Sequence, residues 1–568
     1  MTDQSPERQR RLIRLGLPAL GALAAAALAA GALAGSVVES SAERTARSFT
    51  RAWQRGDFAA MHRLLTPEAR SRHSLAAFRR VYTAAAATAT ATGVAVRDPS
   101  GESDGEVTVQ VAVRTRVFGT LRRQLTLPMK EERVAWTPSL AFPGLSGGAA
   151  LSRTSDPPER GRLLSRDGKV LAEGDFGERS SPLGTLSSSI AGSLGPEEAA
   201  GRAAVYARGF PRRHPVGQSG LERVFEERLA GRPGGELIAA GRVIARAAPR
   251  KAPPVRTTID VGVQEAAVTA LAGRFGGIAA LDARNGEIRA LAGLAFSAPQ
   301  PPGSTFKIVT ATAALEQRLV KPSDEFPVQT AAIIDGVELE NANGESCGGS
   351  FRNSFAHSCN SVFGPLGVKV GAKQLVATAE RYGFNARRAI AGELPSTLPP
   401  ASEITSPLEV GSTAIGQGKV LATPLTMAAM AQTVAAGGVR TEPTLGALER
   451  PAPPVRVTTG RVARTLERLM IDVVAYGTGT AAAIPGVKVA GKTGTAELED
   501  TRGPNAQEEP SDGSNTDAWF TSFAPAGRPR IAVAVLLVRA GAGGATAAPA
   551  ARIVLEAGLR ASRAGQTR

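Results

Sequence analysis

An uncharged, apolar stretch lies near the amino terminus, Leu15–Val38, and is built mainly of Ala, Leu and Gly. About 20 apolar residues in a helix cross the hydrocarbon core of a bilayer, and this stretch is longer. Basic residues beside a span stay cytoplasmic, and four precede it: Arg8, Arg10, Arg11 and Arg14. We therefore expect a cytoplasmic tail at 1–14, a transmembrane anchor at 15–38, and a single-pass protein of the cell membrane with the rest of the chain exported.

The same segment has a second interpretation, a cleaved signal peptide. Ala32-Leu33-Ala34 before Gly35 fits a small-residue cleavage site. The apolar run, however, exceeds the roughly 7–15 residues of a signal core, which favours an uncleaved anchor.

The net charge of +16 could attract nucleic acid, or the anionic polymers and lipids at a membrane surface. The basic residues are scattered, and no run of them alternates with aromatic residues. We expect a solvated basic surface and no nucleic-acid partner.

The 568 residues exceed one ordinary core, so several domains are expected. In 39–142 a helical pattern stops at Gly56-Asp57 and resumes, and beyond Thr92 apolar residues alternate, which predicts strands and an α+β module. Residues 143–254 are rich in Gly and Pro and end in a linker, Pro249–Pro254. Residues 255–568 form the last domain.

That last domain opens with a recognisable pattern. A helix is predicted around 263–271, followed by two apolar runs that flank Asn285-Gly286. Asn-Gly between apolar runs is a strong hairpin signal. We expect an antiparallel strand pair there.

A candidate nucleophile comes next, in Pro302-Gly303-Ser304-Thr305-Phe306-Lys307, ahead of an apolar run that predicts a buried helix. Residues three apart on a helix share a face, so Ser304 and Lys307 would be neighbours. A serine needs a base to become nucleophilic, and a buried lysine can be that base, because burial lowers its pKa. Ser-x-x-Lys alone is a common chance pattern.

Two further motifs follow in order. Ser358-Cys359-Asn360 lies in a polar segment, and Lys492-Thr493-Gly494-Thr495 follows an alternating run, Val487–Gly491, that predicts a strand. The three motifs in this order form the signature of penicillin-binding proteins and class A β-lactamases. Their order makes a weak signal specific.

The chain has two cysteines, Cys347 and Cys359, on the exported side, where thiols tend to be oxidised. We expect a disulfide between them; the alternative is two buried, reduced cysteines.

The sequence resembles the class B penicillin-binding proteins from about residue 160 to the carboxyl terminus. The resemblance includes 282–288, Ile415-Gly416-Gln417-Gly418 and Trp519-Phe520, and 160–168 and 220–231 resemble the family's dimerisation region. Residues 39–142 resemble the NTF2-like module of the penicillin-binding protein 2a subgroup. The implied fold is multidomain α+β, and its transpeptidase domain has an antiparallel sheet flanked by helices.

The resemblance implies a serine D,D-transpeptidase that acts on peptidoglycan stem peptides and is acylated by β-lactams. Ser304 would attack, Lys307 would take its proton, Ser358 would relay a proton to the leaving amine, and Asn360 would orient Lys307. Lys492 and Thr493 would bind the substrate carboxylate, and Gly494 would allow close approach. The N–H groups of Ser304 and Thr495 would form the oxyanion hole.

Two alternative functions are enzymatic and share the acyl-serine step, and a third is not enzymatic. A D,D-carboxypeptidase or a β-lactamase would use water, with Glu393 as the candidate carboxylate; a non-catalytic β-lactam sensor or scaffold is the third. Four histidines, two cysteines and no His-Glu-x-x-His argue against zinc, and no cofactor is expected. A separate membrane glycan polymerase is the implied partner.

Overall fold

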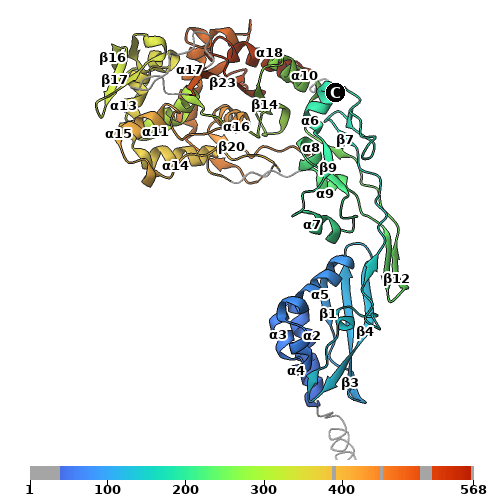
Figure 1. Ribbon diagram of the computed structural model, residues 1–568. Helices are drawn as coiled ribbons and strands as arrows, with labels where there is room; N and C mark the ends of the chain where they lie inside the picture. Colours follow the sequence, from blue (N-terminus) through green and yellow to red (C-terminus); the bar gives the residue numbers. More distant parts are fainter. Residues whose placement is uncertain (1–38, 387–389, 391, 448–451, 499–514, 565–568) are drawn as a thin grey trace, which may run out of the picture. The chain divides into compact units, whose positions relative to one another are not determined.

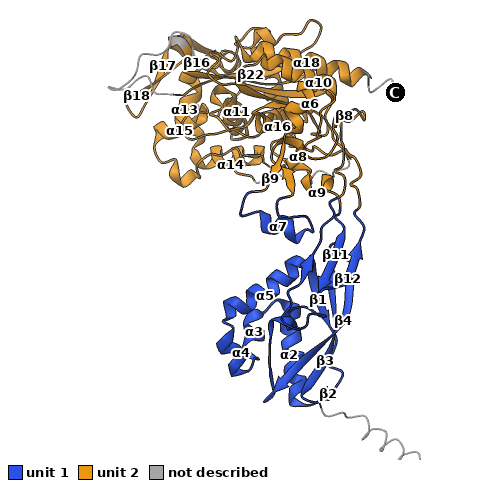
Figure 2. Cartoon of the chain, turned by 45° about the vertical axis from the view of Figure 1, so that its right-hand side comes forward, with its two compact units in different colours: residues 1–157, 198–213, 232–249 blue, residues 158–197, 214–231, 250–568 orange. Residues whose placement is uncertain are grey.

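The computed structural model describes residues 39–386, 390, 392–447, 452–498 and 515–564. The predicted tail and anchor, 1–38, lie outside the described residues. Within the part described, no helix is long and apolar enough to cross a membrane. The chain forms two compact units, coloured separately in Figure 2. The first contains residues up to Pro157 with Glu198–Arg213 and Arg232–Pro249; the second contains Pro158–Glu197, His214–Gly231 and Arg250 onward.

The first unit begins with four helices: α2 (Ser41–Arg55), α3 (Phe58–Arg63), α4 (Pro67–Arg72) and α5 (Leu75–Thr88). Ser40 caps α2 by accepting a hydrogen bond from the N–H of Glu43, whose side chain binds the N–H of Ser40 in return. The helix ends at Gly56, whose φ of 73° is the left-handed conformation that suits glycine. The stop that the sequence predicted at Gly56-Asp57 is confirmed.

An antiparallel sheet follows the helices, which pack against it (Figure 1). Its strands are β1 (Ala91–Val96), β2 (Glu102–Ser103), β3 (Glu106–Thr115), β4 (Thr120–Lys130) and β5 (Arg133–Val134), in the order β1-β3-β4-β5 with β2 on β3. The valines that alternate along β3 are buried. Helices followed by an antiparallel sheet confirm the predicted α+β module.

The segment between 150 and 256 contributes to both units. In the first unit, β6 (Ser152–Arg153), β11 (Gly235–Ala239) and β12 (Arg242–Ala247) form a sheet, and α7 (Arg202–Ala207) lies in the same unit. In the second are β7 (Leu163–Leu164), β8 (Val170–Ala172), α6 (Thr185–Ala191), β9 (Leu194–Pro196), β10 (Pro215–Gly217), α8 (Gly220–Val224), α9 (Glu226–Leu229) and β13 (Val255–Arg256).

A buried ion-pair network joins the stretches 160–168 and 220–231. Arg160 donates to the carboxylates of Glu222 at 2.7 Å and Glu226 at 2.8 Å, and Arg179 donates to Glu222 at 2.6 Å. Removing one partner of such a network leaves a buried charge uncompensated. Each stretch alone is a weak sequence signal of the dimerisation region, and the ion pairs join the two in one structural element.

The rest of the second unit is built on a five-stranded antiparallel sheet in the order β15-β14-β24-β23-β22. The strands are β14 (Gly276–Asp282), β15 (Ile288–Gly293), β22 (Ala490–Glu497), β23 (Thr516–Ala524) and β24 (Ile531–Leu537). Gly286 turns between β14 and β15 with a φ of 73°, which confirms the predicted hairpin. The strand β22 is at the edge of the sheet.

Helices cover both faces of this sheet. α10 (Val261–Leu271) and α18 (Ala547–Ala564) pack on one face with Ile278 and Ala280; α11 (Lys307–Glu316) and α16 (Pro424–Ala435) share a core with Ala279 and Leu281 of the other. Successive strand residues point to opposite faces, so the continuous apolar run of β14 serves both cores.

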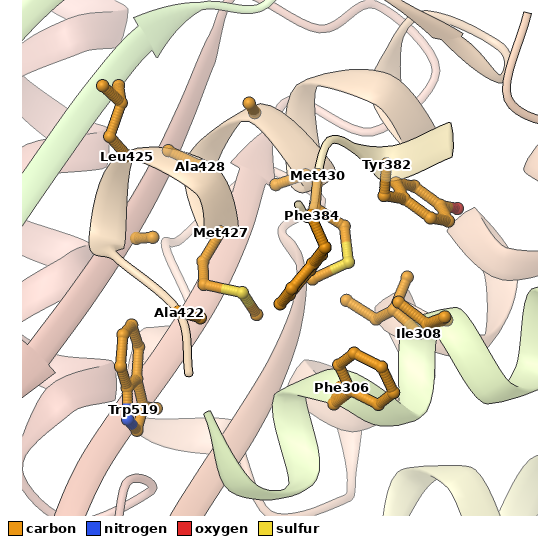
Figure 3. Close-up of a cluster of buried hydrophobic side chains, with 14 of the residues drawn as sticks. Phe306, Ile308, Tyr382, Phe384, Ala422, Leu425, Met427, Ala428, Met430 and Trp519 are labelled. Atoms are coloured by element: carbon orange, nitrogen blue, oxygen red, sulfur yellow. The ribbon is translucent and has the colours of Figure 1, made fainter. Parts of the chain in front are cut away.

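Figure 3 shows the core on the α11 side. Phe306 and Ile308 lie near Phe384, and the rings of Phe306 and Phe384 meet edge to face with centroids 5.5 Å apart. Met427 and Met430 of α16 lie beside Phe384 in the same core. The start of α11, at Phe306 and Lys307, is thus held by a packed core.

The second unit also contains the helices α12 (Phe351–Ala356), α13 (Asn360–Val370), α14 (Ala372–Tyr382), α15 (Pro407–Ala414) and α17 (Gly460–Ala475), of which α13, α14, α15 and α17 contact α11. Three strand pairs belong to it as well: β16 (Glu325–Gln329) with β19 (Cys347–Ser350), β17 (Ala331–Ile334) with β18 (Val337–Glu340), and β20 (Val439–Arg440) with β21 (Val455–Arg456).

Candidate active site

The predicted nucleophile lies on a tight turn. Residues 303–306 form a 3-10 helix, η2 (Gly303–Phe306), which leads directly into α11 at Lys307. A 3-10 helix has three residues per turn, so side chains three apart are eclipsed. Ser304 is half-buried and Lys307 is fully buried. The turn therefore presents Ser304 on the same side as Lys307.

The environment of Lys307 suits a neutral amine. Its Nζ donates hydrogen bonds to the backbone oxygen of Ser358 at 2.5 Å and to Asn360 Oδ1 at 2.6 Å, and lies 3.2 Å from Ser358 Oγ. Burial, and next the positive charge of Lys492, hold the pKa of Lys307 well below its usual 10.5. A neutral lysine can accept a proton from a nearby hydroxyl.

Ser358 lies in the junction between α12 and α13, and Asn360 is the first residue of α13. Ser358 has a φ of 63°, a conformation that a serine adopts only where its surroundings enforce it. Asn360 Nδ2 donates to the backbone oxygen of Glu340 at 2.7 Å, which fixes its amide so that Oδ1 faces Lys307. The neighbouring His357 is exposed, with its ring near that of Tyr476.

Lys492, on strand β22, also contacts Ser358. Its Nζ donates to Ser358 Oγ at 2.8 Å and to the backbone oxygen of Thr493 at 3.1 Å. The side chain is fully buried, and burial lowers its pKa to about 7. One hydroxyl is thus in contact with two lysines, which come from elements far apart in the sequence.

The third motif lies within the edge strand β22. The sequence predicted a strand at 487–491 that ends before the motif; instead β22 begins at Ala490 and continues through Thr495 to Glu497. Lys488 is outside the strand, where its backbone oxygen accepts the N–H of Ala526. The strand starts at Ala490 and not at Val487, because its pairing with β23 runs from Ala490 to Glu497 and includes no earlier residue.

Two glycines allow β22 to approach the nucleophile turn. A Cβ on Gly494 would lie 2.7 Å from the backbone oxygen of Pro302, and a Cβ on Gly303 would lie 2.6 Å from that of Thr495. Gly303 also has a φ of 52°, which favours glycine. The backbone of Thr495 and the turn of Ser304 are therefore in direct contact.

The two cysteines are joined in a disulfide, with Cα atoms 5.4 Å apart. Cys359 is buried between Ser358 and Asn360, and Cys347 begins β19. The bond ties the second motif to strand β19, which pairs with β16.

Sequence reasoning named Gly416 only as part of the family resemblance, without a role, and missed Thr478 altogether. Gly416 pairs with the turn through the hydrogen bond from Gly303 N–H to its oxygen, at 3.0 Å. The hydroxyl of Thr478 lies 2.5 Å from that of Thr493. The run Gly477-Thr478-Gly479 fits no motif with a known mechanism, and only its position between α17 and β22 could have drawn attention to it.

Three family descriptions match the chain. The Penicillin binding protein transpeptidase domain matches residues 276–556, the NTF2-like N-terminal transpeptidase domain matches 41–149, and the Penicillin-binding Protein dimerisation domain matches 177–251.

Named relatives share part of the chain. Peptidoglycan D,D-transpeptidase PbpA of Mycobacterium tuberculosis is 37% identical over 299 residues, which cover 47% of this chain and 56% of that protein. Peptidoglycan D,D-transpeptidase MrdA of Acinetobacter baumannii is 27% identical over 396 residues, which cover 58% of this chain and 59% of that protein. The chain thus spans somewhat over half the length of these curated relatives.

Solved structures match over a larger share. The crystal structure of penicillin-binding protein A from Mycobacterium tuberculosis has a TM-score of 0.57 at 26% identity, and covers 71% of this chain and 99% of that one. The same protein as a penicillin G acyl-enzyme complex has a TM-score of 0.57 at 26% identity, and covers 71% and 100%. The chain is a class B penicillin-binding protein, in which an NTF2-like module and a dimerisation domain accompany the transpeptidase domain.

Proposed function

We propose that this chain is a peptidoglycan D,D-transpeptidase that cross-links stem peptides through an acyl-enzyme on Ser304. The observation that carries the proposal is the convergence of Lys307 and Lys492 on the hydroxyl of Ser358. A buried lysine of low pKa beside a serine turn supplies a base, and a hydroxyl between two lysines supplies a route for the proton.

Acylation follows from this arrangement. Ser304 Oγ attacks the carbonyl carbon of the penultimate D-alanine while its proton passes to Lys307 Nζ. The N–H groups of Ser304 and Thr495 stabilise the resulting oxyanion, which is usually a large contribution to such reactions. The bond to the terminal D-alanine then breaks, and Ser358 gives its proton to the leaving amine as it takes one from Lys307.

The substrate carboxylate belongs at Lys492 and Thr493. Burial lowers the pKa of Lys492 to about 7, and an anion in contact with it would raise that pKa again, because opposite charges favour the ionised forms. Binding would thereby charge Lys492 at the moment when the carboxylate needs a partner.

An acceptor amine completes the cycle in our proposal. It attacks the acyl carbon, loses a proton along the same route in reverse, and releases Ser304 Oγ. A β-lactam acylates the same serine, but its leaving nitrogen stays attached through the opened ring. One relative with 26% identity, penicillin-binding protein A of Mycobacterium tuberculosis, has been solved as acyl-enzyme complexes with two β-lactams, which supports this step.

Hydrolysis is the competing outcome. A β-lactamase activates its water with a carboxylate, whereas among the described residues the side-chain partners of Lys307 and Lys492 are Ser358 and Asn360. The candidate Glu393 lies in the loop after α14, where its N–H donates to the oxygen of Ile390. Resolution by an amine is therefore the favoured reading. The intact lysine–serine arrangement likewise disfavours a silent sensor or scaffold.

The remaining assignments belong to the same proposal. Residues 15–38 would anchor the chain in the membrane, 39–142 would form the NTF2-like domain, 143–254 the dimerisation-like domain with its linker, and 255–568 the extracytoplasmic transpeptidase domain. A monofunctional transpeptidase needs glycan strands, so a membrane polymerase would be its partner.

The test uses the full chain in detergent with a stem pentapeptide and a labelled D-amino acid as acceptor. We expect the labelled D-amino acid to replace the terminal D-alanine in the wild type and no product from Ser304→Ala. If the wild type releases D-alanine but forms only hydrolysed peptide, the chain is a carboxypeptidase instead.

A further inference from the structure

The proposed function gives Thr493 the task of donating a hydrogen bond to the substrate carboxylate, and a second hydroxyl lies against it. We infer that Thr478 is a positioning residue of the carboxylate site. Its hydroxyl donates to Thr493 Oγ1, 2.5 Å away, and thereby directs the proton of Thr493 at the carboxylate. This inference rests on the proposed function and deepens it.

The fold brings Thr478 to this place through the end of α17. The N–H groups of Tyr476 and Gly477 both donate to the backbone oxygen of Asp472, which closes the helix. Any side chain on Gly477 would collide with the backbone oxygen of Ala356. The turn that follows α17 therefore packs closely against the end of α12 at Ala356, which lies two residues before Ser358.

The backbone of Thr478 is fixed at the same contact. Its N–H donates to the oxygen of Ala356 at 3.1 Å. Thr478 thus bridges the helix that precedes the second motif and the strand that carries the third. Because its backbone N–H and its hydroxyl both have partners, Thr478 can hold Thr493 in one orientation relative to Ser358.

The direction of the hydrogen bond follows from counting protons. A hydroxyl has one proton to donate and two lone pairs to accept with. If Thr493 donated to Thr478, it would have no proton left for a carboxylate. The Thr478 hydroxyl can also donate to the oxygen of Ala356, but that contact is 3.4 Å long, against 2.5 Å to Thr493 Oγ1.

Donation from Thr478 to Thr493 therefore satisfies both groups. It leaves the Thr493 proton free for the substrate, and a hydroxyl that accepts a hydrogen bond becomes a stronger donor, because chained hydrogen bonds polarise one another. Thr493 is buried, so its hydroxyl has few alternative partners.

The exposure of Thr478 makes the test clean, because its side chain is not part of the packed core. Thr478→Val keeps the shape and removes the hydroxyl, whereas Thr478→Ser keeps the hydroxyl. Thr465→Val is the matched control: Thr465 lies on α17, the helix that precedes the turn of Thr478, and its hydroxyl donates to the oxygen of Arg461 in the same helix. Thr478→Ala is a second variant if Thr478→Val does not fold.

The measurement is the second-order rate of acylation of the full-length protein by penicillin G and by its methyl ester, which lacks the carboxylate charge. We expect Thr478→Val to slow penicillin G by about 5- to 10-fold, the scale of one hydrogen bond, with a much smaller effect on the ester. Thr478→Ser and Thr465→Val should match the wild type. In a Thr493→Val background, Thr478→Val should have no further effect.

Three outcomes would overturn the inference. They are an unchanged rate in Thr478→Val, an equal loss with both probes, and an undiminished loss in the Thr493→Val background, which would mean that Thr478 acts without Thr493. Each of these requires a wild type that acylates. A wild type that forms no adduct with either probe contradicts the proposed function instead.

Discussion

The side-chain nitrogen of Lys307 lies 2.6 Å from the side-chain oxygen of Asn360, whose own amide is fixed by the backbone oxygen of Glu340. The base is thus oriented by a residue that is itself held in one rotamer. Such support decides whether a lysine faces the serine or turns away from it.

Changing this partner should change how the base titrates. Asn360→Asp puts a negative charge beside Lys307, which favours its charged form and raises its pKa. We expect the rising limb of the pH profile of acylation to move to higher pH, and the rate at neutral pH to fall by at least tenfold. Asn360→Ala should lower the rate without that shift, so equal profiles in both variants would contradict the role of Asn360.

The two lysines predict a bell-shaped pH dependence. Burial and the neighbouring Lys492 lower the pKa of Lys307, and burial lowers the pKa of Lys492 to about 7. Acylation needs Lys307 neutral and Lys492 charged, so the second-order rate should rise as Lys307 loses its proton and fall as Lys492 does, near pH 7 in the free enzyme.

The falling limb can be assigned by substitution. Lys492→Arg keeps the positive charge at all accessible pH values, because a guanidinium does not deprotonate in proteins. The variant should be slower, since the guanidinium is larger, but its rate should not fall above pH 7. A falling limb that persists in Lys492→Arg would show that another group titrates there.

The disulfide should support both stability and activity. The chain-entropy argument gives about 3 kcal/mol for closing a loop of this size. The double variant Cys347→Ser, Cys359→Ser should therefore unfold at lower denaturant concentration, and its acylation should slow, because Cys359 lies between Ser358 and Asn360.

Reductant provides the control for this prediction. It should affect the wild type and leave the double variant unchanged. Peptide mapping of exported, non-reduced protein that found two free thiols would contradict the disulfide itself.

Two glycines near the nucleophile turn make a matched pair. Gly416 and Gly418 have φ values of 77° and 72°, so alanine costs about 1–2 kcal/mol of backbone strain at either. A Cβ on Gly416 would collide with the oxygen of Gly303, whereas one on Gly418 has nothing within 4 Å. Gly416→Ala should therefore lose at least 10-fold more acylation rate than Gly418→Ala, and equal rates in the two variants would rule out this contact as a support of the turn.

The sequence predicted the local features of this fold well, because each has a local physical cause. The Asn285-Gly286 turn, the end of α2 at Gly56 and the buried helix after Ser304 all follow from turn chemistry and apolar periodicity. The order of the three motifs also identified the residues that the structure brings together around Ser358.

What the sequence could not provide depends on contacts between distant segments. The start of β22 at Ala490 is set by pairing with β23, and Ser358, left-handed at φ 63°, is contacted by Lys307 and Lys492 from distant elements. The contact of Thr478 with Thr493 requires the end of α17 to reach β22. Periodicity within one segment contains none of this information.

The role of Ser304 as nucleophile is tested most directly by the mass of the intact protein after incubation with penicillin G, followed by peptide mapping. We expect one adduct with the mass of the whole penicillin, located on Ser304 and lasting for many minutes, and no adduct on Ser304→Ala. An unmodified wild type, or an adduct on another residue, would contradict it.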